Sequence, residues 1–345
     1  MSNYPDKISN IDELNELLSE PTQEVIDFMS RLKGDIMFLG VTGKIGPSMA
    51  RMVVRACKAA GVEKKITGVS AFWPEGSLEE IEDMGIEAIQ GDLLDHAFLD
   101  SLPDVENVFY LVGMKFGAED NLSMTWAVNT LLPAMVVERF KDSKIVAFST
   151  GCVYELVPVK DGGSLETDMP RPVGEYAQSC LGRERMFEYG SKKNGTKVSL
   201  IRLNYAVEMR YGVLIDVAVK VKNEQPVDLS MGYFNVIWQG DANNMIIRSL
   251  EQCGSPAEIL NITGDELISL RETAEKFGKL FNKKVTFTGM EAETALLNNA
   301  AKSYDLFGKP KANSDQMIAW IADWIGKDGE TSGKPTKFQV RDGKY

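Results

Sequence analysis

Histidine and cysteine are scarce in this chain of 345 residues. The one histidine, His96, argues against a Ser-His-Asp triad and against a metal site built from several histidines. We expect His96 to lie in the first turn of a surface helix and give it no catalytic role. The four cysteines are widely and irregularly spaced, at Cys57, Cys152, Cys180 and Cys253. They lack the paired spacing of a metal site, and their pattern argues against a disulfide framework. We therefore predict no bound metal.

Long apolar runs and an excess of basic charge are also missing. No run approaches the roughly 20 apolar residues that span a bilayer, and the N-terminus lacks the apolar core of a signal peptide. We therefore predict no membrane partner and a cytoplasmic location. The net charge of −12 argues against nucleic acid as a partner, because phosphate binding needs a basic surface. The composition, 44% hydrophobic and 26% charged, is typical of a globular protein with one large or two modest domains.

A glycine-rich turn follows the first apolar run of the chain. Residues 36–39 have the pattern of a buried strand, and apolar residues at helical spacing follow between Met49 and Ala60. Between them lie Gly40, Gly43 and Gly46. Strand, glycine turn and helix are the setting in which a backbone cradles the pyrophosphate of a dinucleotide at a helix N-terminus. The pattern therefore predicts binding of NAD or NADP, although three glycines alone also fit a simple tight turn.

The rest of the chain alternates strands and helices up to about residue 205. Six apolar runs have strand character, at residues 36–39, 65–70, 86–90, 108–113, 145–148 and 198–205. This rhythm predicts an α/β fold with a Rossmann-type doubly wound parallel sheet in residues 35–205. Residues 206–325 have a mixed pattern and predict a smaller α+β substrate domain, with return segments to the first domain near 234–262. We expect residues 326–345 to form a loosely packed tail.

Residues 1–34 predict a helical appendage before the first domain. Apolar side chains recur at helical spacing from Ile11 to Leu18 and again from Val25 to Leu32, and Pro21 separates the two segments. Two short amphipathic helices that pack on the main domain explain this pattern. A contact in a homodimer is the other interpretation, and the sequence leaves both open.

Several residues after the predicted strands are candidates for cofactor binding. Ser70 ends the second strand, where an acidic residue would favour NAD and a cation NADP. Lys44 is the nearest cation for a 2′-phosphate, so the cofactor preference stays open. Asp92 has two interpretations, a partner for the adenine amino group or a helix N-cap. Lys115 leaves the fourth strand and either neutralises pyrophosphate or is a solvated surface lysine. Asn129 shares a helical face with apolar residues, so we expect it to organise the active site.

Taken in order, these motifs resemble the extended short-chain dehydrogenase/reductase superfamily, in its NAD-dependent epimerase/dehydratase branch. The resemblance covers about residues 35–325. It depends on the glycine turn, on Gly91-Asp92-Leu93, on Leu111-Val112-Gly113-Met114-Lys115, on Asn129, on Ser149-Thr150 before Val153-Tyr154, on Tyr176 and on Arg202-Leu203-Asn204.

The resemblance implies roles for particular residues. Thr150 falls where a hydroxyl holds the substrate oxygen, and Tyr176 falls at the general acid/base; Asn129 is placed with them as catalytic. Substrate contacts are implied for Thr150, Tyr205 and Arg210. Cofactor contacts are implied for Gly40, Gly43, Lys44, Ile45, Gly46, Ser70, Asp92, Leu93, Leu111, Val112, Gly113, Lys115, Tyr176, Cys180 and Asn204. The implied substrate is a small molecule, a sugar, nucleotide-sugar or related polyol.

One residue departs from the family pattern. The family motif Tyr-x-x-x-Lys reads Tyr176-Ala-Gln-Ser-Cys180 here. The lysine normally lowers the pKa of the tyrosine, which is roughly 10 for a free side chain, and Cys180 carries no such charge. Lys115, Arg183 or the nicotinamide ring are the candidates to supply it.

Two classes of function follow. The first is an NAD(P)-dependent oxidoreductase or epimerase/dehydratase that acts on a carbinol carbon. The second is an NAD(P)-binding protein with little or no catalysis, in a regulatory or scaffolding role. We regard a nucleophilic Cys180 as disfavoured, because no histidine is near it in the sequence to act as its base.

Overall fold

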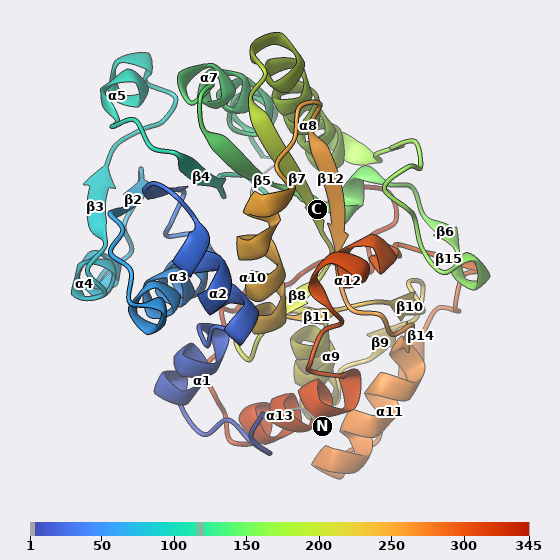
Figure 1. Ribbon diagram of the computed structural model, residues 1–345. Helices are drawn as coiled ribbons and strands as arrows, with labels where there is room; N and C mark the ends of the chain where they lie inside the picture. The colour runs from blue at the N-terminus through green and yellow to red at the C-terminus, as the bar shows by residue number, and fades with distance from the viewer. Residues whose placement is uncertain (1–3, 116, 118–119, 345) are drawn as a thin grey trace.

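The computed structural model describes residues 4–115, 117 and 120–344. Seven parallel strands form its central sheet, in the order β12-β7-β5-β4-β1-β2-β3 (Figure 1). Their bounds are β1 Ile36–Leu39, β2 Ile66–Ser70, β3 Glu87–Gln90, β4 Asn107–Tyr110, β5 Lys144–Thr150, β7 Lys197–Leu203 and β12 Glu258–Ile262. The six predicted strands and the doubly wound α/β fold are confirmed. The seventh strand, β12, comes from the later part of the chain and pairs with β7.

Helices cover both faces of this sheet. On one face α2 (Gln23–Arg31), α3 (Gly46–Ala60) and α10 (Gln239–Arg248) bury a core that includes Phe38, Met49 and Ile246. On the other face α5 (His96–Ser101), α7 (Leu132–Arg139) and α8 (Gly174–Asn194) enclose a second core. Helix α4 (Ser77–Asp83) follows β2, with Ile81 buried in the first of these cores.

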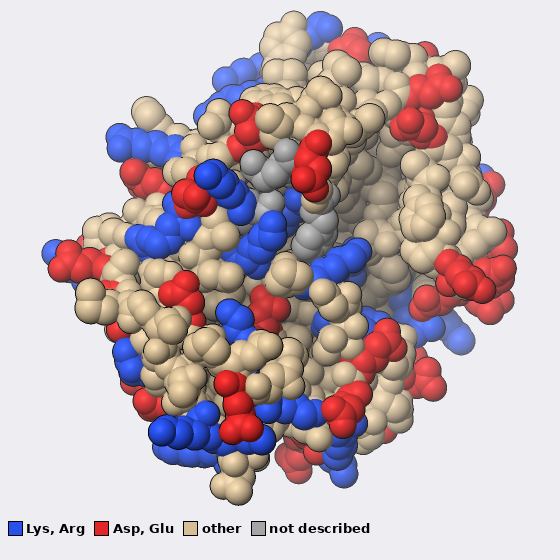
Figure 2. Space-filling model, turned by 180° about the vertical axis from the view of Figure 1, so that it is seen from behind, with Lys and Arg blue, Asp and Glu red and all other residues tan. Residues whose placement is uncertain are grey.

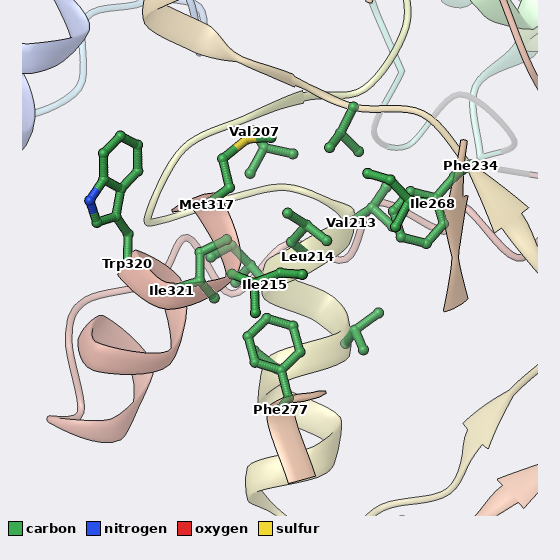
Figure 3. Close-up of a cluster of buried hydrophobic side chains, with 14 of the residues drawn as sticks. Val207, Val213, Leu214, Ile215, Phe234, Ile268, Phe277, Met317, Trp320 and Ile321 are labelled. Carbon is green, nitrogen blue, oxygen red and sulfur yellow. The ribbon is translucent and has the colours of Figure 1, made fainter. Parts of the chain in front are cut away.

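A separate hydrophobic core lies below the sheet. Helices α9 (Val213–Lys222), α11 (Leu270–Phe281) and α13 (Ser314–Gly326) surround it (Figures 1 and 3). Figure 3 shows Leu214, Phe277 and Trp320 among its members. Short strand pairs complete this region: β6 (Val157–Pro158) with β15 (Thr294–Ala295), β8 (Ala206–Val207) with β11 (Ile237–Trp238), β9 (Val227–Asp228) with β14 (Phe287–Thr288), and β10 (Tyr233–Phe234) with β13 (Ile268–Ser269).

Three segments of the chain are interrupted. Residues 233–238 are divided between the short strands β10 and β11, and α12 (Ala301–Phe307) begins after β15 and an irregular stretch. The helical segment after β4 consists of α6 (Leu122–Trp126), a π-helical turn η1 (Ala127–Leu131) and α7. Single π-turns of this kind are frequent at functional sites, and this one carries Asn129.

The N-terminal helices pack on the main body. Helix α1 (Ile11–Leu18) buries Leu14 and Leu18, and the Asn243 amide of α10 donates to the Leu18 carbonyl at 3.1 Å. Tyr4 donates to the Asp241 carboxylate at 2.8 Å. Helix α2 buries Val25, Phe28 and Met29 on the face that α3 covers. The interpretation as two packed amphipathic helices is confirmed, whereas a dimer contact stays a prediction.

Residues 327–335 of the tail are largely exposed and form no helix or strand, as expected of a loosely packed tail, whereas residues 336–343 are anchored to the rest of the chain. Phe338 is buried and meets the Phe234 ring edge-on at a centroid distance of 5.9 Å. Arg341 donates to the Thr294 carbonyl at 2.9 Å and to the Ser230 carbonyl at 3.0 Å. None of the helices in the described part of the chain is both long and apolar enough to cross a membrane.

Candidate active site

The turn between β1 and α3 has the geometry that its glycines predict. Gly40 adopts φ +85°, in the left-handed region that favours glycine. A Cβ on Gly46 would lie 2.0 Å from the Val41 carbonyl oxygen, so only glycine allows α3 to start this close to the turn. Gly43 is exposed, and a Cβ there would meet only the Gly40 oxygen, at 3.3 Å. The backbone at Gly43 is therefore open to a ligand at the helix N-terminus.

An outer cleft of about 640 Å³ lies beside this turn. Among its lining residues are Gly43, Leu111, Gly113 and Arg210, each predicted to contact ligand. Five lining residues are basic and three acidic: Lys44, Arg51, Lys115, Arg210 and Lys334 against Glu80, Glu208 and Glu330. A chain with a net charge of −12 thus gathers positive charge here. Figure 2 shows basic side chains grouped near the centre of the back face. The cleft suits an anionic ligand such as a pyrophosphate.

A smaller inner chamber of about 180 Å³ adjoins the outer cleft. Thr150 and Tyr176 both line it, although 26 positions separate them in the sequence, and Ile45, Asn204 and Tyr205 line it too. Lys44 and Lys115 line both cavities, so they mark the place where the two meet. The structure therefore brings the predicted acid/base Tyr176 and the predicted oxygen-binding Thr150 together next to the predicted cofactor turn.

Tyr176 lies at the start of α8, which begins at Gly174. The side chain is half-buried, and the phenol forms a hydrogen bond with the Cys180 thiol one helical turn further on. Desolvation raises the pKa of Tyr176 well above its usual value, and the two thiols at Cys180 and Cys152 add to this, whereas Arg183 lowers it. The Lys115 ammonium lies 5.9 Å from the centroid of the Tyr176 ring.

Thr150 is the last residue of β5 and caps the short helical turn after it. Its Oγ1 accepts a hydrogen bond from the backbone N–H of Cys152 at 3.2 Å. This bond fixes the side chain but uses the oxygen only as an acceptor, so the hydroxyl can still donate to a substrate oxygen. Asn204 follows β7, and its Nδ2 donates to Asn235 Oδ1 at 2.9 Å.

Lys44 crosses from the glycine turn toward the other half of the sheet. Its ammonium donates to the Ala206 carbonyl at 2.9 Å and lies 4.0 Å from the Tyr211 ring centroid. Ala206 follows β7, whereas the adenosine ribose of a dinucleotide is expected at the end of β2, on the far side of β1. In the structure Lys44 therefore faces away from the place expected for a 2′-phosphate, and its role as a phosphate partner stays a prediction. The side chain is open to the cleft, yet desolvation around the ammonium lowers the pKa of Lys44 to about 7.

Asn129 lines neither cavity and acts through other groups. Its Oδ1 accepts from the Met114 N–H at 2.8 Å and from Arg183 at 2.7 Å, and its Nδ2 donates to the Met114 carbonyl and to Ser179 Oγ. Its carboxamide thus holds the segment after β4 against α8. The role of organiser fits these contacts, and Asn129 is a positioning residue rather than a catalytic one.

Arg183 is a buried cation close to Tyr176. Its guanidinium is buried and donates to the Phe148 carbonyl at 2.8 Å as well as to Asn129. It lies close to Gly113, where a Cβ would be 2.7 Å from Nη2. Its positive charge lowers the pKa of both Tyr176 and Cys180, although burial still raises the pKa of Cys180 to about 11. A fixed cation therefore stands near the position of the missing lysine.

A buried ion pair joins strand β7 to helix α8. Arg202 on β7 and Glu184 on α8 are 1% and 0% exposed, and their closest atoms are 2.7 Å apart. Ser149 Oγ donates to Glu184 Oε1 at 2.5 Å, and Arg202 donates to the Tyr154 hydroxyl at 2.6 Å. This network fixes β5, β7 and α8, the elements that present Thr150 and Tyr176.

Comparison with known proteins adds a view of the whole chain. No family model matches the chain, and no curated protein matches it in sequence. Solved structures do match. The UDP-glucuronic acid 4-epimerase of Bacillus cereus, in complex with NAD, is 17% identical with a TM-score of 0.69, over 86% of this chain and 99% of the epimerase. This chain has the same fold as that epimerase.

Two further structures have similar scores. The UDP-glucose 4-epimerase of Thermotoga maritima, with UDP-glucose, has 16% identity and a TM-score of 0.68, over 85% of this chain and 99% of its own. The dTDP-glucose 4,6-dehydratase DesIV of Streptomyces venezuelae, with NAD and TYD bound, has 15% identity and a TM-score of 0.70, over 85% and 97%. Each match covers nearly the whole neighbour but leaves part of this chain without a counterpart.

Some predicted cofactor residues lie outside both cavities. Ser70 is buried, and its hydroxyl donates to the Phe72 carbonyl at 2.8 Å. Asp92 accepts from the Leu94 N–H at 2.9 Å, and Asp95 rather than Asp92 caps the next helix. Leu93 belongs to a hydrophobic core, Val112 packs against Gly40, and Cys180 is fully buried beneath Tyr176. Cofactor contacts by these residues stay predictions.

The sequence interpretation missed several lining residues. Tyr211 lines both cavities, Cys152 lines the chamber, and Ser332, Lys334 and Thr336 come from the C-terminal tail. No motif marks them. Among the described residues, no group of three or more His, Cys, Asp and Glu side chains forms a metal site.

Proposed function

We propose that this protein is an NAD-dependent enzyme that acts on a carbinol carbon of a carbohydrate, as an oxidoreductase or an epimerase/dehydratase. One observation carries the proposal: Thr150 and Tyr176 line the same small chamber, which adjoins a basic cleft at an exposed glycine turn. Structural neighbours with this fold were solved with NAD and with UDP-glucose. Both support a cofactor and a carbohydrate substrate of this kind.

The cavity residues have separate roles in this proposal. Bound NAD would exchange a hydride with the carbinol carbon. Tyr176 would take the hydroxyl proton or return it, while the Thr150 hydroxyl holds the reacting oxygen. The exposed backbone at Gly43 and the Lys115 ammonium would hold the pyrophosphate. The residues present thus fit a dinucleotide.

The charge that Cys180 does not supply comes from other cations in this proposal. Arg183 is buried beside Tyr176, and Lys115 lies near its ring. At an effective dielectric of about 20, a unit charge about 4 Å away is worth roughly 4 kcal/mol to an ionised phenol. Of these two cations, Lys115 also lines the chamber. Its ammonium and the bound nicotinamide together would favour the ionised phenol of Tyr176.

NAD rather than NADP is the proposed cofactor. Residues 70–75 after β2 contain no lysine or arginine, and Lys44 points toward Ala206 instead. A 2′-phosphate would therefore meet no cation from this segment. Binding of NADP as tight as that of NAD would contradict this choice.

Two variants test the enzyme proposal. Tyr176→Phe and Thr150→Val should each lower kcat at least a hundredfold on any carbinol substrate, while NAD binding by calorimetry stays within a few-fold. Tyr189→Phe is the matched control, because Tyr189 lies on the same helix and is 63% exposed. Unchanged turnover in Tyr176→Phe would rule out the assignment.

A binding protein without catalysis is the second candidate. Cys180 favours this second candidate. Its thiol forms a hydrogen bond with the Tyr176 phenol, the group that should ionise in catalysis, and contributes to the raised pKa of Tyr176. NAD binding with no turnover across a broad panel of carbohydrates would support this candidate. A steady-state rate on any of them would exclude it.

We also propose a homodimer. Leu122, Met124 and Leu131 on α6 and η1 are exposed apolar residues, at 42%, 43% and 55%. Burial of such a surface between two copies would remove it from water. Light scattering tests the mass in solution, and Leu131→Glu should weaken a dimer formed here. The cytoplasmic location stays a prediction from the sequence.

A further inference from the structure

The C-terminal tail crosses the mouth of the candidate active site. Glu330, Ser332 and Lys334 line the outer cleft, and Thr336 lines the inner chamber. The Ser332 N–H donates to the Arg210 carbonyl at 2.9 Å. In Figure 1 the tail leaves α13 at the bottom and ends near the middle of the molecule. We name residues 330–341 the C-terminal strap.

The centre of the strap is fastened beside the chamber. The N–H and hydroxyl of Thr336 donate to the same Asp216 oxygen, at 2.8 and 2.5 Å. The Thr336 carbonyl accepts from the Lys115 ammonium at 3.2 Å. Thr336 is 2% exposed, so these bonds lie away from water. One residue therefore joins α9, the strap and the lysine that faces Tyr176.

Two further anchors hold the end of the strap. Phe338 inserts into the lower hydrophobic core against Phe234. Arg341 makes three bonds to Ser230 and Thr294 through its guanidinium. Beyond it, Gly343 packs so closely on Val173 that a Cβ would lie 2.3 Å from the Val173 oxygen. Val173 immediately precedes α8, which presents Tyr176, so the residues that follow the strap reach the start of this helix.

The fastened strap limits the size of what the chamber can hold. The chamber has about 180 Å³ with Thr336 as one wall. Pockets for drug-sized ligands are roughly 300–1,000 Å³. A ring of monosaccharide size fits the inner chamber. A nucleotide attached to that ring would extend out of the chamber, either into the space that the strap fills or into the outer cleft, where NAD is expected.

We propose that the C-terminal strap is a specificity element that restricts this protein to free carbohydrates of monosaccharide size and excludes nucleotide-activated sugars. The proposal rests on the proposed function, which makes the inner chamber the substrate site.

A binding comparison tests the strap without the need for turnover. UDP-glucuronic acid and free glucuronic acid are the probes, titrated by calorimetry into protein saturated with NAD. The full chain should bind glucuronic acid and bind UDP-glucuronic acid at least tenfold more weakly than a variant with a detached strap, Phe338→Ser with Arg341→Ala. Lys344→Ala is the control, because Lys344 is exposed and lies beyond the anchors.

A second variant covers the case in which loss of Phe338 unfolds the protein. Asp216→Asn with Thr336→Ala loosens only the centre of the strap and leaves both end anchors in place. It should bind UDP-glucuronic acid at least tenfold more tightly than the full chain, and limited proteolysis with trypsin should cut it after Lys337 more rapidly.

The outcomes separate the two proposals. Equal affinity of the full chain and both strap variants for UDP-glucuronic acid would overturn the strap proposal, whether that affinity is high or absent. Unchanged turnover in Tyr176→Phe would overturn the proposed function and leave the binding comparison intact.

Discussion

The Cys180 thiol occupies the position one helical turn after Tyr176 and forms a hydrogen bond with its phenol. Burial raises the pKa of Cys180 to about 11, so at neutral pH the thiol keeps its proton. It brings neither positive charge nor reactivity. The phenol therefore stays protonated over a wider pH range than in a site with a lysine there.

Restoring a lysine should shift the pH dependence of the reaction. In Cys180→Lys the new ammonium favours the ionised phenol, so the rising limb of kcat/KM against pH should move at least one unit lower. In Cys180→Met the new side chain has a volume similar to that of lysine but carries no charge. This variant should therefore leave the rising limb of the pH profile where it is in the natural chain. A pH profile of both variants on the same substrate measures the difference, and equal profiles would contradict an electrostatic role for this position.

The buried ion pair between Arg202 and Glu184 should dominate the stability of the site. Glu184→Gln leaves the Arg202 guanidinium buried without its counter-charge, and breaking a buried pair in this way costs about 3–5 kcal/mol. Urea denaturation at pH 7 measures the loss. Glu251→Gln is the control, because its pair with Arg31 is exposed at 55% and 35% and should contribute little. Similar losses in both variants would contradict the prediction.

The sequence was most informative about the sheet. Short apolar runs that end in glycine or polar residues predicted the six strands up to residue 203, because each run is local and five of the six strands are largely buried, with β3 the exception. The sequence pattern predicts return segments to the first domain near residues 234–262, but it does not predict which strand β12 pairs with. Its pairing with β7 joins residues such as Glu258 and Ser199 that are far apart in the chain, and the short run 258–262 looks the same at the edge of any sheet.

The candidate site was predictable where a motif fixes the backbone. Thr150 and Tyr176 reach one chamber because each ends or begins a regular element at the same edge of the sheet. Side-chain direction was not predictable for Lys44, whose long stem reaches Ala206 instead of the end of β2. The strap was missed because Phe338 is its one large apolar residue and its partner Phe234 lies about a hundred positions earlier.

Two glycines of the turn should respond differently to alanine. In Gly43→Ala the new Cβ projects into the outer cleft and meets only the Gly40 oxygen, so stability should hold while NAD affinity falls at least tenfold. In Gly46→Ala the Cβ would lie 2.0 Å from the Val41 oxygen, so the melting temperature should fall by several degrees. Calorimetric titration and thermal melting distinguish them. Full NAD affinity in Gly43→Ala would place the pyrophosphate elsewhere.

Lys44 should make stability depend on pH between about 7 and 10.5. Desolvation lowers its folded-state pKa to about 7 from the ordinary value of 10.5. Between these values the unfolded chain holds a proton that the folded chain lacks, so the free energy of unfolding rises with pH through this group. Below pH 7 Lys44 is protonated in both the folded and the unfolded chain, so the folded chain carries the full desolvation cost of the Lys44 ammonium.

Lys44→Met should remove that dependence. The variant should gain stability relative to the natural chain at pH 6, and the gain should shrink toward pH 10. The difference should be modest, because the side chain of Lys44 is open to the cleft and water screens it. Urea midpoints at pH 6 and pH 9 measure it, with Lys58→Met as the control, because Lys58 is an exposed lysine on α3, the helix that follows the glycine turn. A natural chain and a Lys44→Met variant with parallel pH dependence would show that this ammonium keeps its ordinary pKa, and that it is fully charged beside the chamber at neutral pH.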